Sequence, residues 1–343
     1  MFGNWFPAAD LTIQNKLVID EAFFDCDEQM RYFGNRSRYL QLGSGPFNGR
    51  LFATDVGDVS IFIEYSNQPL EKEVLIPPDS YSFVTAISCM QPEVPFGGVT
   101  KSTDWLQVAA PGSEHIALVP SECLLVLTRI KKAALLYHSA FLPEVLDWFS
   151  ALPKRPVFVT SPWLAERFSA DVRVVMESML SSGAQSYRAA ADKAFICGLV
   201  NAFNMEWLRQ SMIATHKTSR ARERFLLARK LLLESQEDSA EHFRVTSLKI
   251  GSQRLVEQAF SNQVNMGPLS YLRLARLHNA RRKLLDKALE DESIGDIAAE
   301  EGFWDWSRFT SYYRRQFGEL PSETRSQLPG AANRGFHAAT ARS

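Results

Sequence analysis

The sequence lacks the features that would place this chain in a membrane or outside the cell. It has 343 residues, 45% of them hydrophobic and 22% charged. No apolar run reaches the roughly 18 residues that a membrane-spanning helix needs. The first residues, MFGNWFPAADLTIQNK, lack the basic-then-apolar order of a secretory signal peptide. The four cysteines are far apart and match no zinc spacing. We therefore expect a cytoplasmic protein with reduced thiols and no membrane partner.

The chain also lacks the residue patterns that accompany catalysis and cofactor binding. The glycines of GSGPFNG (43–49) are followed by no Lys-Ser or Lys-Thr pair, which argues against a P-loop. No Gly-x-Ser-x-Gly elbow occurs, and no Cys/His pairing is evident. His115 and His138 have no histidine partner at a metal-binding spacing. We expect no enzyme activity, no metal and no cofactor, and an N-terminal enzyme fused to a second module is the weakest alternative.

Neither sign of charge is in excess. The chain has 38 Lys and Arg against 39 Asp and Glu, for a net charge of −1. Residues 1–220 hold 19 basic and 23 acidic residues, and residues 221–325 hold 17 and 16. If the C-terminal third binds nucleic acid, it must therefore rely on cations placed locally and on contact geometry, because it has no strong overall field.

Short apolar runs between turn residues fill the first part of the chain. RLFATDVGDVSIFIEY alternates on both sides of Gly57-Asp58, a dipeptide suited to a tight hairpin turn. The runs SYSFVTAI, WLQVAA, HIALVP and CLLVLTRI follow, separated by Pro, Gly, Ser or Asp. Strands at this spacing predict an antiparallel sandwich or small barrel over about residues 30–137. We assign residues 1–138 to a β-rich domain.

A helical period replaces this pattern from about residue 139 to 215. In YRAAADKAFICGLVNAFNMEWL an apolar residue recurs every four positions, and this stripe must pack on another surface. The stripe consists of Phe195, Leu199, Phe203 and Trp207. It forms either a dimer interface or a cover for the β-rich domain, and the period fits both. We assign residues 139–218 to a helical extension and dimerisation region.

Residues 219–325 contain a helical repeat. A shift of 53 residues brings Ser252 onto Asp305, and both are good N-cap residues that open a helix. The same shift brings FSNQVNMGP onto YRRQFGELP, so that an aromatic residue and a proline coincide in both copies. Each copy also keeps an apolar stripe, which predicts a small core of its own.

The second copy has the plan of a helix-turn-helix. SIGDIAAEEG places Ile294, Ile297 and Ala298 on one face and ends at Gly302, a residue typical of helix ends. A helix, a turn with glycine and a capped second helix form a motif whose second helix suits the DNA major groove. Two such units, joined by the helix YLRLARLHNARRKLLDKAL, are suited to successive major grooves about 34 Å apart.

The order of these C-terminal motifs is specific. SIGDIAAEEGFWDWSRFTSYYRRQFGELPSETR has an Ile-Ala pair, a Gly-Phe turn, an aromatic pair and Phe-Gly-x-x-Pro-Ser-x-x-Arg. It resembles the second helix-turn-helix of the AraC/XylS family of bacterial transcription regulators, and MGPLSYLRLARLHNARRKLL resembles the family's linker helix. The first copy, EDSAEHFRVTSLKIGSQRLVEQAF, keeps the capped second helix without a clear Leu-Ala pair. Lys249 stands there where the second copy has Gly302.

The resemblance implies which side chains face DNA. Base-facing positions fall on Trp306, Ser307, Arg308 and Ser311 in the second copy, with Arg314 and Arg315 as phosphate contacts, and on Gln253, Arg254, Glu257 and Gln258 in the first. The chemistry suits these positions, because Arg pairs with guanine, Gln with adenine and Glu with the cytosine amino group, while Ser serves several bases. By contrast, the stripe of Phe309, Tyr313 and Phe317 is expected to be core.

Alternatives stay open at three of these places. Trp306 replaces the polar residue common in the family, and it either contacts the groove or packs on its own helix. Glu257 either accepts from cytosine or is a surface carboxylate that DNA repels. The run Arg281-Arg282-Lys283 on the linker helix is more typical of a solvated or salt-bridged face than of a DNA contact.

The N-terminal part has a looser resemblance. RYLQLGSGPFNGRL, IFIEYSNQPL and IPPDSYSFV are similar to the sensor half of the regulators grouped with the ethanolamine-utilisation activator. In the wider family such domains are cupin-like barrels with an inducer pocket. The implied fold is α+β, with an N-terminal β-rich, cupin-like sensor domain and its helical extension, followed by an all-α C-terminal domain with two helix-turn-helix units (219–325).

The expected function is sequence-specific regulation of transcription, with activation favoured by the resemblance. The implied partners are double-stranded promoter DNA, RNA polymerase, an unknown small-molecule effector and a second copy of the chain. The effector must discriminate between two arrangements of the helix-turn-helix units if it is to act. The alternative is a constitutive DNA-binding regulator whose N-terminal domain serves only dimerisation. Residues 326–343 have low hydrophobicity and no period, which predicts a disordered tail.

Overall fold

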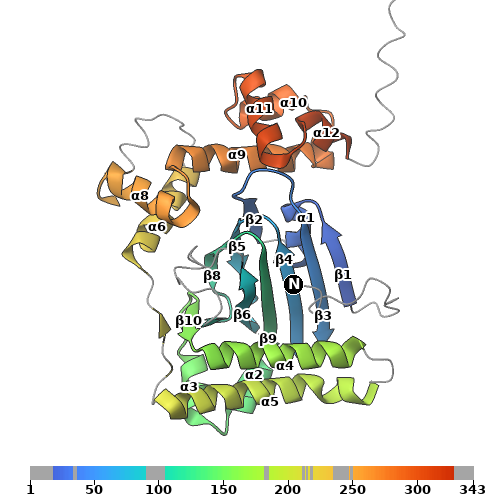
Figure 1. The fold of residues 1–343 in the computed structure, drawn as a ribbon, viewed down its shortest axis with the longest axis vertical. Helices are drawn as coiled ribbons and strands as arrows, with labels where there is room; N and C mark the ends of the chain where they lie inside the picture. Colours follow the sequence, from blue (N-terminus) through green and yellow to red (C-terminus); the bar gives the residue numbers. More distant parts are fainter. Residues whose placement is uncertain are drawn as a thin grey trace, which may run out of the picture. The chain divides into compact units, whose positions relative to one another are not determined.

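The computed structural model describes most of the chain as two compact units (Figure 1). The first unit comprises residues 1–41 and 47–219, and the second comprises residues 42–46 and 220–343. The described residues are 18–33, 37–89, 105–180, 185–210, 213, 215–216, 219–234, 247 and 250–327. The expected tail lies almost entirely outside the described residues, and so does most of the helix expected before the capped helix of the first copy.

Two antiparallel sheets form the body of the first unit. The larger has the strand order β1-β3-β4-β9-β6-β7-β10-β11, and the smaller has the order β2-β5-β8. The strands are β1 (Val18–Phe23), β2 (Arg38–Gln41), β3 (Gly49–Val56), β4 (Val59–Ser66), β5 (Leu70–Leu75), β6 (Ser80–Cys89), β7 (Trp105–Ala109), β8 (Glu114–Val119), β9 (Cys123–Lys131), β10 (Val157–Thr160) and β11 (Thr215–His216). This arrangement confirms the predicted β-rich N-terminal fold.

The predicted hairpin at Gly57-Asp58 is present. Strands β3 and β4 pair in register up to Val56 opposite Val59, which leaves a two-residue turn. Gly57 has φ +59°, a conformation that costs glycine little. The backbone N–H of Asp58 donates to a carboxylate oxygen of Asp192 at 3.1 Å, so a helix residue holds the turn from outside the sheet.

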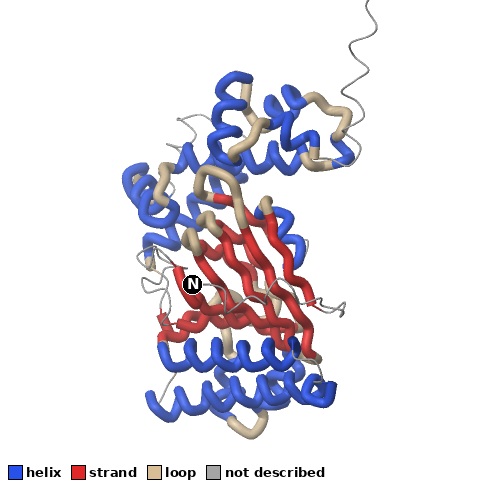
Figure 2. The backbone as a smooth tube through the Cα atoms, turned by 45° about the vertical axis from the view of Figure 1, so that its right-hand side comes forward, coloured by secondary structure: helices blue, strands red, loops and turns tan. Residues whose placement is uncertain are grey.

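Helices cover the outer face of the larger sheet (Figure 2). They are α2 (Lys132–Ser139), α3 (Pro143–Ser150), α4 (Pro162–Leu180) and α5 (Gln185–Gln210), while the short α1 (Cys26–Met30) and η1 (Arg31–Phe33) precede β2. The apolar stripe of α5 packs into this layer. The Phe203 ring lies 5.0 Å from that of Phe149 and 6.2 Å from that of Phe83, measured between centroids.

The position of this stripe decides between its two predicted roles. Phe195, Leu199 and Phe203 are each buried in the chain's own core, and Trp207 packs against the same core. The stripe therefore covers the sheet, and the interpretation of these four side chains as a dimer interface was wrong.

The region expected to be helical also contributes two strands. Strand β10 pairs with β7, with Phe158 opposite Gln107, and β11 pairs with β10. The run VFVT has the β-branched and aromatic residues that suit a strand. Its partner lies about fifty residues earlier in the chain, and so a local pattern does not reveal the pairing.

The second unit is helical. Its helices are α6 (Arg220–Glu234), α8 (Gln253–Val264), α9 (Pro268–Leu284), α10 (Ile294–Glu300), α11 (Trp306–Phe317) and α12 (Pro321–Ser326), with the 3₁₀ turn η2 (Lys287–Leu289). None of the helices in the described part of the chain is long and apolar enough to cross a membrane.

Candidate nucleic-acid interface

Helix α11 is defined at both ends by its sequence. At its start the carboxylate of Asp305 accepts the N–H of Arg308 at 3.0 Å, as an N-cap does. At its end Gly318 adopts φ +79° and its N–H donates to the carbonyl of Arg314 at 2.8 Å. The helix is thus limited to 12 residues, and its exposed side chains stand in fixed positions.

The aromatic stripe of α11 forms a small core, as predicted. Phe309 and Tyr313 are 0% exposed and Phe317 is 8% exposed. The ring centroids of Phe309 and Tyr313 lie 5.6 Å apart, and those of Tyr313 and Phe317 lie 4.6 Å apart. Ile297 and Ala298 of α10 complete this core, which confirms that α10 and α11 pack as one unit. We call α10, the turn after it and α11 the second helix-turn-helix.

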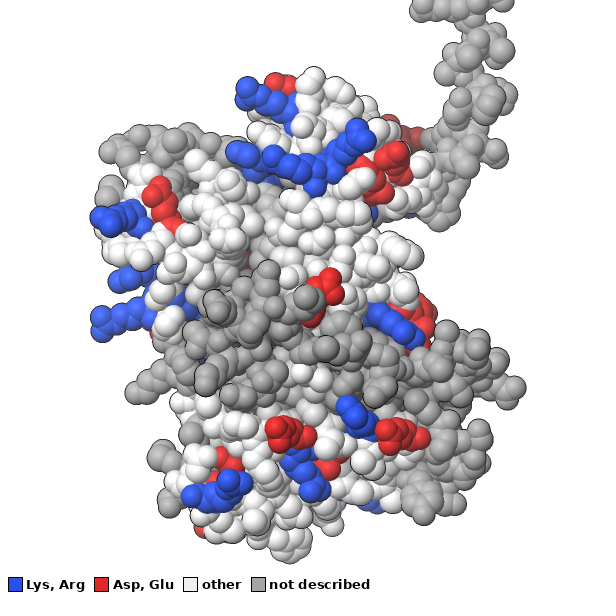
Figure 3. All heavy atoms as spheres, viewed as in Figure 1, with Lys and Arg blue, Asp and Glu red and all other residues white. Residues whose placement is uncertain are grey.

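The other side of α11 is exposed and basic. All six residues predicted to face DNA are exposed: Trp306, Ser307, Arg308, Ser311, Arg314 and Arg315. Ser307, Ser311 and Arg314 follow at steps of four and three, and therefore share one face of the helix. Figure 3 shows Lys and Arg side chains gathered across the C-terminal helices at the top of the view. The helix carries three arginines and no acidic residue.

Two aromatic residues shape this exposed face. Trp306 is 51% exposed and its ring centroid lies 5.8 Å from that of Phe309, so one part of it packs while the other remains available. The guanidinium groups of Arg315 and Arg273 lie 5.2 and 4.7 Å from the Tyr312 ring centroid. These cation–π contacts restrict where Arg315 points.

Helix α8 repeats the construction of α11. The Ser252 hydroxyl accepts the N–H of Leu255 at 3.3 Å, and Asn265 ends the helix in a left-handed conformation with φ +52°. Both helices have 12 residues, and each is followed by a helix that begins with proline. The predicted repeat is thus confirmed for the capped helices.

The exposed face of α8 differs in charge. Its predicted DNA-facing residues are all exposed: Gln253, Arg254, Glu257 and Gln258. The Gln253 amide donates to the Glu257 carboxylate at 2.8 Å. One arginine and one glutamate leave this helix without net charge, whereas α11 carries +3. Contact with phosphates is therefore expected to depend more on α11 than on α8.

The turn of the second helix-turn-helix depends on one glycine. Gly302 has φ +83°, a conformation that side chains with a Cβ rarely adopt. An added Cβ would also lie 2.6 Å from Nη1 of Arg276, the mobile end of a long side chain. Backbone strain therefore decides the cost of a substitution here, because the arginine can move.

We expect Gly302→Ala to destabilise the second helix-turn-helix by about 1 kcal/mol. The control is Gly295→Ala inside α10, where an added Cβ would meet no atom closer than 3.6 Å. Alanine there is expected to stabilise the helix by up to about 1 kcal/mol. Amide hydrogen exchange of α10 in the full chain measures both changes. If both substitutions changed the stability of α10 in the same direction, the positive φ at Gly302 would have no special role.

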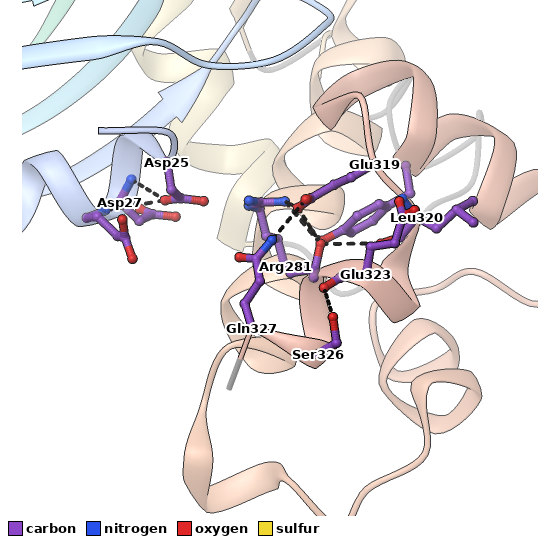
Figure 4. Close-up of polar contacts among 11 residues, drawn as sticks. Asp25, Asp27, Arg281, Glu319, Leu320, Glu323, Ser326 and Gln327 are labelled. Atoms are coloured by element: carbon purple, nitrogen blue, oxygen red, sulfur yellow. Dashed lines mark hydrogen bonds and ion pairs between the residues drawn. The ribbon is translucent and has the colours of Figure 1, made fainter. Parts of the chain in front are cut away.

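The basic run of the linker helix α9 is engaged within the domain. Arg281 is 6% exposed and donates to Glu319, and to the hydroxyl of Thr324 at 3.2 Å (Figure 4). Lys283 pairs with Glu300 and Glu301 at 2.8 Å each. These contacts support the salt-bridged alternative for Arg281 and Lys283.

One pairing that the sequence did not reveal lies in the first unit. Sγ of Cys197 on α5 and Nδ1 of His138 on α2 are 3.3 Å apart, a contact that was not evident in the sequence. Fifty-nine residues separate the two positions, and no local motif marks them. A catalytic pair needs a third group that orients the histidine. No such hydrogen bond to His138 occurs in the part of the chain that the structure describes.

Comparison with known proteins identifies the C-terminal domain. A protein-family model described as "Helix-turn-helix domain" matches residues 251–327. The chain is 36% identical over 84 residues to the XylDLEGF operon transcriptional activator of Pseudomonas putida, a match that covers 24% of this chain and 26% of that protein. It is also 36% identical over 75 residues to the HTH-type transcriptional activator RhaS of Yersinia pestis, covering 22% and 26%.

These matches cover about a quarter of the length of each relative. Among solved structures, the AraC-like transcriptional activator CuxR is 12% identical and aligns over 76% of this chain and 95% of its own, with a TM-score of 0.38. That score is too low to establish a shared fold across both units. The predicted relationship to the AraC/XylS family is confirmed, and it lies in the C-terminal helix-turn-helix domain.

Proposed function

We propose that this chain is a sequence-specific DNA-binding regulator of transcription that activates its target promoters. The main support is the second helix-turn-helix, in which one face of α11 is buried and the opposite face exposes three arginines and two serines. Such a helix suits the major groove, where arginine pairs with guanine and serine accepts several partners. Both relatives named above are transcriptional activators, which favours activation and contact with RNA polymerase.

Helix α8 supports a second contact with the same DNA. Its exposed glutamines suit adenine, and Glu257 suits the amino group of cytosine. Helix α9 connects α8 to the second helix-turn-helix, and its 17 residues correspond to about 25 Å of helix. The proposed site on DNA is therefore asymmetric, with two clusters of bases about one helical turn apart.

In this proposal the first unit responds to a small-molecule effector and the chain acts as a dimer in the cytoplasm, without enzyme activity. An effector changes DNA engagement only if it binds one arrangement of the units more tightly than another. The boundaries proposed for these roles are residues 1–138 for sensing, 139–218 for the helical extension and dimerisation, 219–325 for DNA binding and 326–343 for the tail. The dimer contact lies elsewhere than the buried stripe of α5.

The test is selection of bound sequences from random duplex DNA by the full-length chain. We expect an asymmetric consensus with two base clusters about one turn apart. Arg308→Ala is expected to relax one position in one cluster and to weaken binding of the consensus by about 1–3 kcal/mol. Arg308 is suited to this test because its side chain is 77% exposed and its 3.4 Å contact with Asp305 contributes little to folding.

The matched control is Arg167→Ala in the first unit. This arginine is 53% exposed and pairs with Asp171 on its own helix, so the change removes one positive charge far in sequence from the motif. It should leave the consensus unchanged. Enrichment of a single cluster of bases would mean that only one of the helices α8 and α11 contacts bases. No enrichment even at low salt would refute the proposed function.

A further inference from the structure

Three charged side chains line a cavity between the two sheets of the first unit, and two of them are buried while the third, Arg129, is half-buried. The cavity encloses about 540 Å³ of space not filled by atoms, including some that is open to solvent, and about 40 Å³ of it is wide enough to admit water. Its walls come from both sheets, with Glu64, Leu125 and Arg129 on the larger and Tyr39 and Lys72 on the smaller. Of the other lining side chains seven are apolar and four are polar, the polar ones being Ser37, Ser82, Gln107 and His115.

One cation of the cavity is neutralised from within. Nζ of Lys72 lies 2.5 Å from the carboxylate of Glu64, and both side chains are almost completely buried. The same carboxylate accepts from the Gln29 amide at 3.0 Å. Burial, and then the charge of Glu64, raise the pKa of Tyr39 well above its ordinary value, so this phenol stays neutral. Lys72 therefore needs no further anion.

The other cation, Arg129, has no carboxylate at ion-pair distance among the described residues, and the negative charge of Asp55 acts on it only from farther away. Arg129 donates to the carbonyl of Phe33 at 3.2 Å, and its guanidinium lies 5.8 and 5.3 Å from the ring centroids of Phe33 and Phe62. No carboxylate of the described residues pairs with it. Its Nε is buried and has no hydrogen-bond partner among them. Burial lowers the pKa of Arg129 from its ordinary value, although a guanidinium remains charged at neutral pH.

We infer that this cavity binds a small organic monoanion, whose carboxylate is held by Arg129 and whose apolar body lies against Val84, Leu125 and Leu127. The inference rests on the proposed function, because it gives the chemical class of the effector. A guanidinium presents parallel N–H donors that match the two oxygens of a carboxylate. Binding would give the buried Nε an acceptor, which is costly to leave without one, and the half-buried guanidinium a counter-ion.

The cavity also limits what else can bind. Lys72, Arg129 and Glu64 together leave one positive charge, which matches one carboxylate better than a doubly charged phosphate. The wall formed by Val84, Leu125 and Leu127 disfavours a sugar, because hydroxyl groups placed against it would lose their hydrogen bonds to water. Because little of the space admits water, the apolar body must be slim or the lining side chains must move.

The first experiment compares acids with their neutral counterparts on the full-length chain. Straight-chain carboxylates from propionate to octanoate, their primary amides and inorganic phosphate are titrated by calorimetry, and the melting temperature is followed in parallel. We expect at least one acid to bind and to raise the melting temperature. The matching amide should bind about thirtyfold more weakly or worse, because it brings no negative charge to the guanidinium of Arg129.

Variants then assign the binding to the arginine. Arg129→Gln is expected to reduce affinity for the acid to that for the amide, and Arg129→Lys should restore part of it by keeping the charge without the paired donors. The control is Arg50→Gln on β3, where the arginine pairs with Asp20 at 2.8 Å and does not line the cavity. This change should leave the affinity for the acid unaltered.

Three results would overturn the inference: no acid of the series binds, acid and amide bind equally, or phosphate alone gives the same shift as the acid. These comparisons use the unmodified chain, so they hold even if Arg129→Gln folds poorly. A folded Arg129→Gln chain that binds the acid normally would also overturn it. Binding of the selected DNA consensus is measured on the same preparations. A chain that binds the consensus but no carboxylate refutes the effector class and leaves the proposed function intact.

Discussion

Phe309→Ala is expected to destabilise the second helix-turn-helix by about 3–5 kcal/mol. The Phe309 side chain is 0% exposed, and its ring centroid lies 5.1 Å from that of Phe303 and 5.6 Å from that of Tyr313. Removing the ring opens a cavity where α10 meets α11, in a cluster too small to close it by rearrangement. Hydrogen–deuterium exchange of the peptide that covers α11 measures this local opening in the full-length chain.

Trp304→Ala provides a matched control. Trp304 lies in the turn between α10 and α11 and loses a larger ring than Phe309 does, but it is 86% exposed. We expect a change within about 0.5 kcal/mol, because surface substitutions rarely cost more. If the two variants increase exchange of α11 equally, the aromatic stripe does not hold the helix in place.

Substitutions on the two opposite faces of α11 should have different effects on the stability of the helix and on DNA binding. Phe309→Ala is expected to weaken DNA binding and also to reduce the protection of α11 against hydrogen exchange. Both effects follow because a locally unfolded helix presents no ordered face to DNA. Arg308→Ala should weaken DNA binding while the exchange of α11 stays unchanged. Loss of protection in the arginine variant would show that its side chain serves the fold, which its exposure argues against.

The second helix-turn-helix could be predicted because its determinants are local. A carboxylate that caps α11, a glycine with positive φ in the turn and an apolar residue at every fourth position all lie within about 25 residues. Caps and turns depend on short-range geometry, and the stripe depends only on the helical period. In the first copy the same reasoning reached α8 but not the helix before it, where Lys249 replaces the turn glycine and the chain lies outside the described residues.

The cavity of the first unit was not predictable in the same way. Glu64 and Lys72 are only eight residues apart, but they belong to different sheets, and their contact depends on how the sheets face each other. Arg129 follows the apolar run Cys123–Leu127 in β9 and pairs in register with Ser60 and Ser82. One indication of the cavity was present in the sequence, namely a charged residue at the end of an apolar run, because a strand buried on both faces normally excludes charge. Without the register, that indication does not say which face the side chain occupies.

The contact between α5 and the larger sheet illustrates the same limit. The period of the helix showed that one face must be covered. It did not show whether the cover was this chain or a second copy, because an apolar stripe packs equally well on either. Only the ring contacts of Phe203 with Phe83 and Phe149 decide the matter.

Arg281→Met is expected to destabilise the packing of α9 against α11 and α12 by about 3 kcal/mol. The Arg281 side chain is 8% exposed, and its guanidinium joins three elements. It donates to Glu319 between α11 and α12, to the Thr324 hydroxyl of α12 and, at 3.4 Å, to the Tyr313 hydroxyl of α11. Methionine retains most of the apolar stem but leaves the carboxylate of Glu319 without its cation. Exchange of α11 and α12 measures the loss.

Lys283→Met is the control on the same helix. Lys283 also pairs with two carboxylates, but its side chain is 32% exposed, so water replaces the lost partners. We expect a cost below about 1 kcal/mol. Adding Glu319→Gln to Arg281→Met should cost less than the sum of the two single changes, because the second change removes the charge that the first leaves unpaired. Simple additivity would contradict a coupled pair.

The Arg281 contacts also connect the fold to DNA recognition. Arg281 holds the linker helix α9 to the C-terminal end of α11, since its guanidinium lies 4.7 Å from the Phe317 ring centroid and donates a hydrogen bond to the Tyr313 hydroxyl. Its loss is expected to free α11 from α9 while the core of the first copy, built on Phe225, Phe260 and Tyr271, stays intact. Arg281→Met should therefore protect only the base cluster read by α8 in a footprint on the selected consensus. Protection of both clusters, together with faster exchange of α11, would mean that DNA itself restores the position of the helix.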